Sequence, residues 1–92
     1  MTDIKPFSIA TPEADLDDLR RRLTSTRWPE RETPDDWSQG IPLDYVKDIC
    51  SYWRDEYDWR RCEAWLNNIP QFTTEIDGLD FHFLHIRSPH KN

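Results

Sequence analysis

The chain has 92 residues, of which 33% are charged and 13% aromatic, and its net charge is -6. This length fits one small domain, and the aromatic content is not that of a disordered polymer. The acidic balance argues against nucleic acid or an anionic membrane as a partner, because a surface that binds phosphates needs clustered, unpaired Lys and Arg.

The N-terminus predicts neither a membrane span nor a signal peptide. No run approaches the roughly 20 apolar residues of a span, and MTDIKPFSIATPEAD lacks the charged-then-apolar order of a signal peptide. Cys50 and Cys62 form no disulfide framework and fit free thiols in a reducing compartment. The predicted location is the cytoplasm.

The first predicted helix runs from about Pro12 to Thr24. Thr11 followed by Pro12 is typical of an N-cap and a first helical turn. The apolar face of this helix is predicted from Leu16, Leu19 and Leu23. Its basic run, residues 20–22, follows Asp17 and Asp18 at the spacing that pairs charges on one helix face. We therefore interpret the run as a solvated, internally paired face.

A long ordered loop is predicted next. The segment TSTRWPERETPDDWSQGIP carries three prolines, one glycine and two tryptophans, without helical or strand periodicity. We expect Trp28 and Trp37 to pin this loop to a neighbouring surface.

Two further helices are predicted before a C-terminal hairpin. The second helix begins after Pro42, and the third has Asp58 as its N-cap. The inward face of the second is predicted from Leu43, Val46, Ile49 or Cys50, Trp53 and Tyr57. The inward face of the third is predicted from Trp59, Cys62 and Leu66, with Trp65 as a further candidate. This helix is predicted to end at Asn67, Asn68 and Pro70. We expect Trp53, Trp59 and Leu66 to be core residues.

The stretch FTTEIDGLDFHFLHIR, residues 72–87, predicts a β-hairpin turned at Asp77-Gly78, where the backbone φ must be positive. The predicted pairs are Ile76 with Leu79, Thr74 with Phe81 and Phe72 with Phe83. One face of the hairpin is then almost wholly apolar. Residues 83–86 are apolar on both sides, which is typical of a strand inside a larger sheet, whereas two strands alone are marginal in water. The predicted fold is therefore mostly α, with a C-terminal β-hairpin.

Few residues are candidates for a metal site or a nucleophile. Zinc ligands are present as Cys50, Cys62, His82 and His85. The spacing opposes a zinc site, since side chains three apart on a strand point to opposite faces and the cysteines are twelve residues apart without a tight loop. A Cys-His nucleophile needs an exposed thiol of low pKa, and both thiols lie on apolar helix faces. We expect packed cysteines and hydrogen-bonded histidines instead.

The remaining candidates carry no clear chemistry. Adjacent carboxylates occur at Asp35-Asp36 and Asp55-Glu56, but glycoside hydrolysis needs a separated acid and base. The tryptophans could form a sugar or cation platform, yet their spacing favours core packing. Gly40 and Gly78 form no phosphate loop. We therefore predict no catalytic, cofactor-binding or metal-binding residue in this chain.

Six stretches follow one another in a distinctive order: IKPFSI, LDDLRRRL, TRWPE, YWRDEYDWR, LNNIPQF and IDGLDFHFLHIRS. In this order and spacing, the chain resembles the N-terminal region of α/β-hydrolase epoxide hydrolases of the microsomal and juvenile-hormone type. The resemblance covers nearly the whole sequence, and YDWR followed by LN, PQF and IDG is its most specific part.

The resemblance implies a structural part of an enzyme. Residues 1–70 would form the family's N-terminal meander of three helices, and residues 71–92 the first two antiparallel strands of the eight-stranded hydrolase sheet. The nucleophilic Asp, the His with its acidic partner, the two cap tyrosines and the oxyanion hole would all lie beyond residue 92. With no anchor ahead of Met1, the chain is similar to the soluble bacterial and fungal members.

The activity implied is hydrolysis of an epoxide to a vicinal diol through a covalent Asp ester, without a cofactor. The implied partners are the rest of the chain's own hydrolase and cap domains, a small-molecule epoxide for the whole enzyme, and a second copy in a homodimer. The alternative is a free-standing helical protein-interaction module without enzymatic activity. Coding sequence for an oxyanion motif after codon 92 would distinguish the two.

Overall fold

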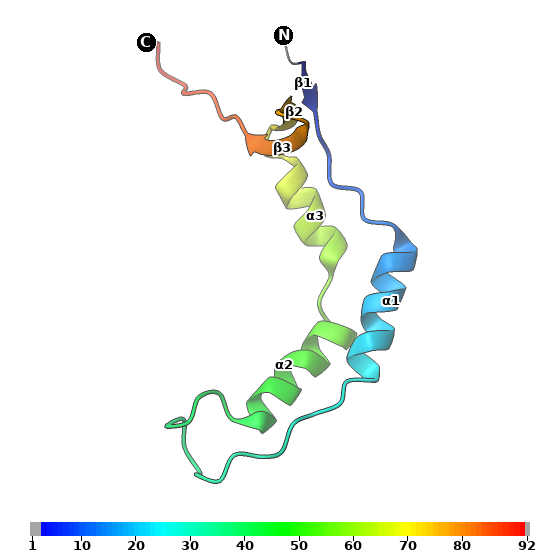
Figure 1. The fold of residues 1–92 in the computed structure, drawn as a ribbon, viewed down its shortest axis with the longest axis vertical. Helices are drawn as coiled ribbons and strands as arrows, with labels where there is room; N and C mark the ends of the chain where they lie inside the picture. Colours follow the sequence, from blue (N-terminus) through cyan, green and yellow to red (C-terminus); the bar gives the residue numbers. More distant parts are fainter. Residues whose placement is uncertain (1–2, 92) are drawn as a thin grey trace. The chain divides into compact units, whose positions relative to one another are not determined.

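The computed structural model describes residues 3–91, which fall into two compact units (Figure 1). The first unit is built from residues 3–10 and 58–91, and the second from residues 11–57. The elements in chain order are β1 (Ile4–Pro6), α1 (Glu13–Thr24), α2 (Leu43–Asp55), α3 (Trp59–Asn67), β2 (Gln71–Ile76) and β3 (Leu79–Leu84). The three predicted helices and the hairpin are confirmed, while β1 was not predicted.

In the second unit, helices α1 and α2 pack against each other. Leu16 of α1 is 7% exposed and is the one buried apolar residue in the part of the chain that the structure describes. The predicted Thr11 cap is wrong, because Pro12 itself occupies the N-cap position with an extended ψ of 142°. The Pro12 carbonyl accepts the first helical hydrogen bonds, from the backbone N–H groups of Asp15 and Leu16.

Helix α2 begins directly after Pro42, as predicted, but its N-terminus is capped from a distance. Pro42 offers no side-chain acceptor, and the Glu32 Oε2 atom accepts the Leu43 N–H at 2.9 Å. The neighbouring Arg31 donates two hydrogen bonds of 2.7 Å to the Asp44 carboxylate. The loop before α2 is therefore fixed by charged residues.

The two tryptophans of that loop contribute less than expected. The Trp37 ring lies 5.1 Å from the Tyr45 ring in an edge-on arrangement, but its side chain is largely exposed. Trp28 lies at the boundary between half-buried and exposed, and the Lys47 Nζ atom is 5.9 Å from its ring centroid. The expectation that tryptophans pin the loop is therefore supported only by these two contacts, one with a tyrosine ring and one with a lysine.

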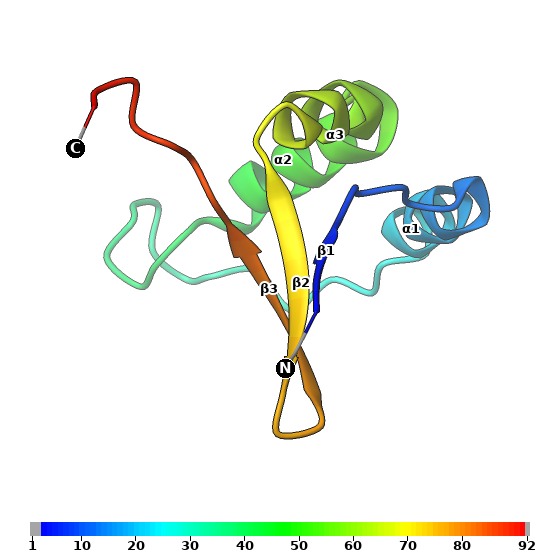
Figure 2. The same cartoon turned by 90° about the horizontal axis from the view of Figure 1, so that it is seen from above.

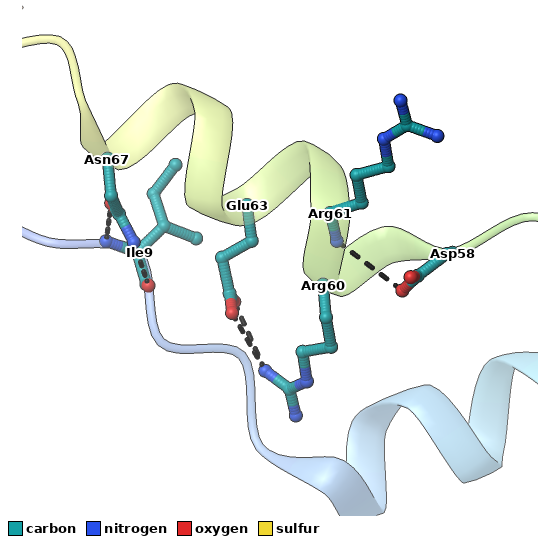
Figure 3. Close-up of polar contacts among 6 residues, drawn as sticks. All are labelled: Ile9, Asp58, Arg60, Arg61, Glu63 and Asn67. Carbon is teal, nitrogen blue, oxygen red and sulfur yellow. Dashed lines mark hydrogen bonds and ion pairs between the residues drawn. The ribbon is translucent and has the colours of Figure 1, made fainter.

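Helix α3 begins and ends as predicted (Figure 3). The Asp58 carboxylate accepts the Arg61 backbone N–H at 3.4 Å, which satisfies one of the unpaired donors of the first turn. Arg60 and Glu63 form an ion pair of 3.0 Å one turn apart on the same helix. The helix ends at Asn67, with Asn68 as the C-cap.

The three strands form one antiparallel sheet in the order β1-β2-β3 (Figure 2). All three predicted hairpin pairs are confirmed. Strand β1 adds Ile4 opposite Thr74 and Pro6 opposite Phe72. A three-residue run that contains proline carries almost no strand signal, yet proline is tolerated in an edge strand, which explains why β1 escaped prediction.

The predicted core positions on α2 and α3 are not buried. Trp53 is 44% exposed and Trp65 is 64% exposed, while Trp59 and Leu66 are half-buried. The prediction that Trp53, Trp59 and Leu66 form the core is therefore wrong for this chain. Helical periodicity identifies an apolar face correctly, but it carries no information on whether anything covers that face.

The hairpin turn leads to a stability prediction. Asp77 and Gly78 have φ values of 53° and 81°, as a two-residue turn of this kind requires. Gly78→Val is expected to lower the free energy of unfolding by about 1 kcal/mol or more. A Cβ at this position would meet nothing within 4 Å, so the cost comes from the backbone and not from a clash. Chemical denaturation of the parent and the variant measures the loss.

Gly78→Asn is the matched control, because asparagine tolerates positive φ better than a β-branched residue does. Its expected loss is smaller than that of Gly78→Val. Equal losses for the two variants would show that backbone conformation is not the cause.

Candidate functional site

The structure places the predicted metal and nucleophile candidates apart from any shared centre. Cys50 lies on α2 in the second unit and Cys62 on α3 in the first, both half-buried and free. His82 is hydrogen-bonded to Gln71, and the His85 ring lies 6.3 Å from the Phe72 ring. Within residues 3–91, no cluster of three or more His, Cys, Asp or Glu side chains could hold a metal ion.

The charged candidates form local pairs. The basic run of α1 is internally paired, as predicted: Arg20 contacts Asp17 at 3.3 Å, while Arg21 and Arg22 both contact Asp18. The hydrogen bond from Arg22 lowers the pKa of Asp18 below its ordinary value.

The adjacent carboxylates also have neighbouring partners. Asp55 is paired with Arg54 at 2.8 Å, and the hydrogen bond from this arginine lowers the pKa of Asp55. Asp36 accepts the Ser38 backbone N–H at 2.9 Å, and Asp35 and Asp36 are both exposed. These contacts are those of solvated surface charges.

A buried polar junction joins the elements of the first unit. The Gln71 side chain, only 5% exposed, donates from Nε2 to the Leu66 carbonyl at 2.7 Å and presents Oε1 to the His82 Nε2 at 2.8 Å. Because a carbonyl can only accept, the Leu66 contact fixes the orientation of the amide, so His82 Nε2 carries the proton and donates. The Phe7 ring lies edge-on to His82 at 5.0 Å. The end of α3, two strands and the N-terminal segment therefore meet at Gln71.

A second contact fastens the N-terminal segment to the end of α3 (Figure 3). The Ile9 N–H donates to Asn67 Oδ1, and Asn67 Nδ2 donates back to the Ile9 carbonyl, both at 2.8 Å. The side-chain amide thus pairs with the backbone as a neighbouring strand would. Together with β1, this contact holds the N-terminal segment on the first unit.

One side of the sheet is an open apolar surface. Residues directly opposite in an antiparallel pair share a face, so the register assigns one side completely. Its members, here called the apolar sheet face, are Ile4, Pro6, Phe72, Thr74, Ile76, Leu79, Phe81 and Phe83. The Phe72 and Phe83 rings stack at 5.7 Å, but Ile4 and Leu79 are more than 60% exposed.

The apolar sheet face is the strongest candidate for a functional surface. Contiguous apolar patches on a protein surface mark places of interaction, whereas single exposed apolar residues do not. The alternating pattern of residues 72–83 identified most of this face in the sequence. Ile4 and Pro6 were missed, since only pairing across the sheet assigns them to it.

Helices α1, α2 and α3, as far as the structure describes them, are all too short and too polar to cross a membrane.

Comparison with known proteins gives consistent matches. The profile of the family described as "Epoxide hydrolase N terminus" matches residues 4–92. A protein of Stigmatella aurantiaca (strain DW4/3-1), whose name assigns it provisionally to the epoxide hydrolases, is 58% identical over 89 residues, which are 97% of this chain and 20% of that protein. Epoxide hydrolase 1 of Oryctolagus cuniculus is 37% identical over 86 residues, which are 94% of this chain and 19% of that protein.

The fold also has a close counterpart among solved structures. The Aspergillus niger epoxide hydrolase superimposes with a TM-score of 0.86 at 34% identity, over 96% of this chain and 24% of that structure. The present chain thus spans about a fifth of the length of the relatives that it matches. With almost all of its residues matched by the family profile, the chain belongs to the family of epoxide hydrolase N termini.

Proposed function

We propose that this chain is the non-catalytic N-terminal part of an epoxide hydrolase. The observation that carries the proposal is the apolar sheet face, which stands open in a chain that matches a fifth of its relatives' length. An exposed surface of this kind is unfavourable unless another part of the protein covers it. The rest of the enzyme is the partner that would do so.

The division of labour within the chain follows from the same features. Residues 1–70 act as a helical meander over the hydrolase domain, and residues 71–92 provide the first hairpin of its sheet. Support comes from β3, whose outer edge has no partner strand among residues 3–91. The His85 N–H also donates to the Pro70 carbonyl at 3.1 Å, so the pairing continues past Gln71, the first residue of β2, and Leu84, the last residue of β3. Strand β1 attaches the start of the meander to this hairpin.

The proposed reaction needs groups outside this chain. A carboxylate attacks an epoxide carbon, forming an ester C–O bond as the ring C–O bond breaks, and the released oxygen takes a proton from an acidic hydroxyl. Water activated by a general base then attacks the ester carbonyl, which frees the vicinal diol and restores the carboxylate. We place all of these groups beyond residue 92 and propose no cofactor. The two free cysteines support a reducing compartment, and the cytoplasm is the proposed location.

A single turnover in oxygen-18 water tests the enzyme assignment. The complete polypeptide, in excess over an aromatic or alkyl epoxide, is expected to give a first diol without label, because the new hydroxyl oxygen comes from the enzyme carboxylate. Label should appear after repeated turnovers, once hydrolysis has placed it in that carboxylate. Mass spectrometry of the diol measures both stages. Label in the first diol would mean direct hydration and would contradict the ester mechanism.

The 92-residue chain is the control in that experiment. It is expected to give no diol, and its open sheet face and sheet edge are expected to make it self-associate into dimers or larger species in size-exclusion chromatography. Turnover by this chain alone would overturn its assignment as a scaffold.

A further inference from the structure

The second unit contains an open groove, which is a separate feature from the apolar sheet face of the first unit. It lies between the segment of residues 28–41 and helix α2, and its volume is about 250 Å³. Most of its lining is apolar and consists of Trp28, Pro29, Ile41, Leu43 and Val46. Ile41 is 60% exposed, so solvent reaches this lining. An apolar surface that is open in this way is a candidate contact for a side chain from another part of the protein.

Two acidic residues, Glu30 and Glu32, also line the groove. Glu32 accepts the Leu43 N–H, and this hydrogen bond lowers its pKa, so the carboxylate is charged at neutral pH. Arg31, which lies between the two glutamates in sequence, donates two hydrogen bonds to Asp44 instead. The groove therefore has two carboxylates beside its apolar lining.

The rest of the second unit also has an excess of negative charge. Residues 11–57 contain twelve Asp and Glu against seven Lys and Arg, which is -5 of the total charge of -6. Lys47 holds its ammonium group 5.9 Å from the Trp28 ring centroid but is not among the residues that line this groove. The groove thus combines two carboxylates with an apolar and aromatic lining.

We propose that this groove receives a Lys or Arg side chain from the part of the enzyme beyond residue 92, with the methylene stem over Ile41 and the cationic head at Glu30. This inference rests on the proposed function, which supplies the remaining chain. A purely apolar side chain would desolvate the two carboxylates without compensation, and an acidic one would be repelled. A long basic side chain satisfies both parts of the groove at once.

Site-directed crosslinking in the complete enzyme tests the proposal. Ile41→Cys, in a background with Cys50 and Cys62 changed to alanine, is labelled with a benzophenone maleimide and irradiated, and the joined peptides are identified by mass spectrometry. We expect a peptide from beyond residue 92 that carries Lys or Arg at or next to the point of attachment. Attachment only within residues 1–92, or to a peptide without a basic residue, would overturn the proposal.

Charge variants make the test specific. Glu30→Lys should abolish this crosslink and Glu30→Gln should reduce it, while the matched control Asp35→Lys, in the same loop but outside the groove, should leave it intact. Equal crosslinking in Glu30→Gln and the parent would also overturn the proposal. Epoxide hydrolysis is assayed on the same preparations. If the enzyme is active but the crosslink is absent, only the proposal for the groove is contradicted. If the parent enzyme is inactive on epoxides, the proposed function is contradicted.

Discussion

Leu16→Ala is expected to lower the free energy of unfolding by about 2–5 kcal/mol, the usual loss when a buried leucine is truncated and a cavity remains. Leu16 is the one apolar side chain that is buried within residues 3–91, and it lies on the helix that packs against α2. Because Leu16 is the single buried apolar residue of the second unit, no other buried side chain can compensate for its loss. Urea denaturation of the complete enzyme, followed by tryptophan fluorescence, measures the loss.

Leu16→Met is the control at the same position. It keeps most of the side-chain volume and is expected to cost less than about 1.5 kcal/mol. If alanine and methionine destabilise the protein equally, or if alanine is neutral, Leu16 is not the anchor of this unit.

Gln71→Ala is expected to have the second-largest effect. The change removes the buried amide that pairs with both the Leu66 carbonyl and the His82 Nε2–H. The carbonyl keeps the Ile69 N–H at 3.1 Å and His82 is exposed, so the expected loss is that of two hydrogen bonds, about 0.5–1.5 kcal/mol each. The stability loss should appear in denaturation, and the environment of His82 should change in its imidazole NMR signals.

Gln39→Ala is the matched control, because Gln39 is an exposed glutamine outside the sheet; it lines the groove beside α2, but the contact proposed there is made by Glu30 and Ile41. It should change stability by less than about 0.5 kcal/mol. His82→Ala removes only one of the two contacts of Gln71 and should fall between the two. A Gln71→Ala variant as stable as Gln39→Ala would show that the junction does not hold the first unit together.

The sequence was informative wherever the determining interaction is local. Asp77-Gly78 gave the correct turn and register, since two residues with positive φ fix the pairing of the strands that they join. Asp58 gave the start of α3 for a similar reason, because a cap acts over three residues. Elements whose cause lies within one turn of chain were therefore predicted closely.

Interactions between distant residues were not predicted. Glu32 caps a helix that begins eleven residues later, and β1 pairs with a strand almost seventy residues away. Gln71 gave no sign of burial, since a polar residue at the start of a strand is ordinarily read as exposed. The predicted burial of Trp53 was wrong for the opposite reason, because an apolar helix face has the same sequence pattern whether it is covered or open.

The two candidate surfaces were also predictable only where their residues lie in periodic segments. Strands β2 and β3 could be assigned to the apolar sheet face by alternation alone, but Ile4 became part of it only through pairing with Thr74. The groove beside α2 could not be predicted, because the course of an aperiodic loop places Trp28 and Ile41 together. In a periodic segment the sequence predicts which side chains share a face, whereas in an irregular segment it does not.

Strand β1 also has a consequence for how the protein is made. Ile4 and Pro6 leave the ribosome almost seventy residues before their partners Thr74 and Phe72. At synthesis rates of about 5–20 residues per second, this delay is roughly 3 to 14 s. Residues 11–57 are contiguous and can collapse during the wait, while the leading strand stays unpaired. The second unit can therefore form before β1 is paired, and for those seconds β1 is open to chaperones and to neighbouring chains.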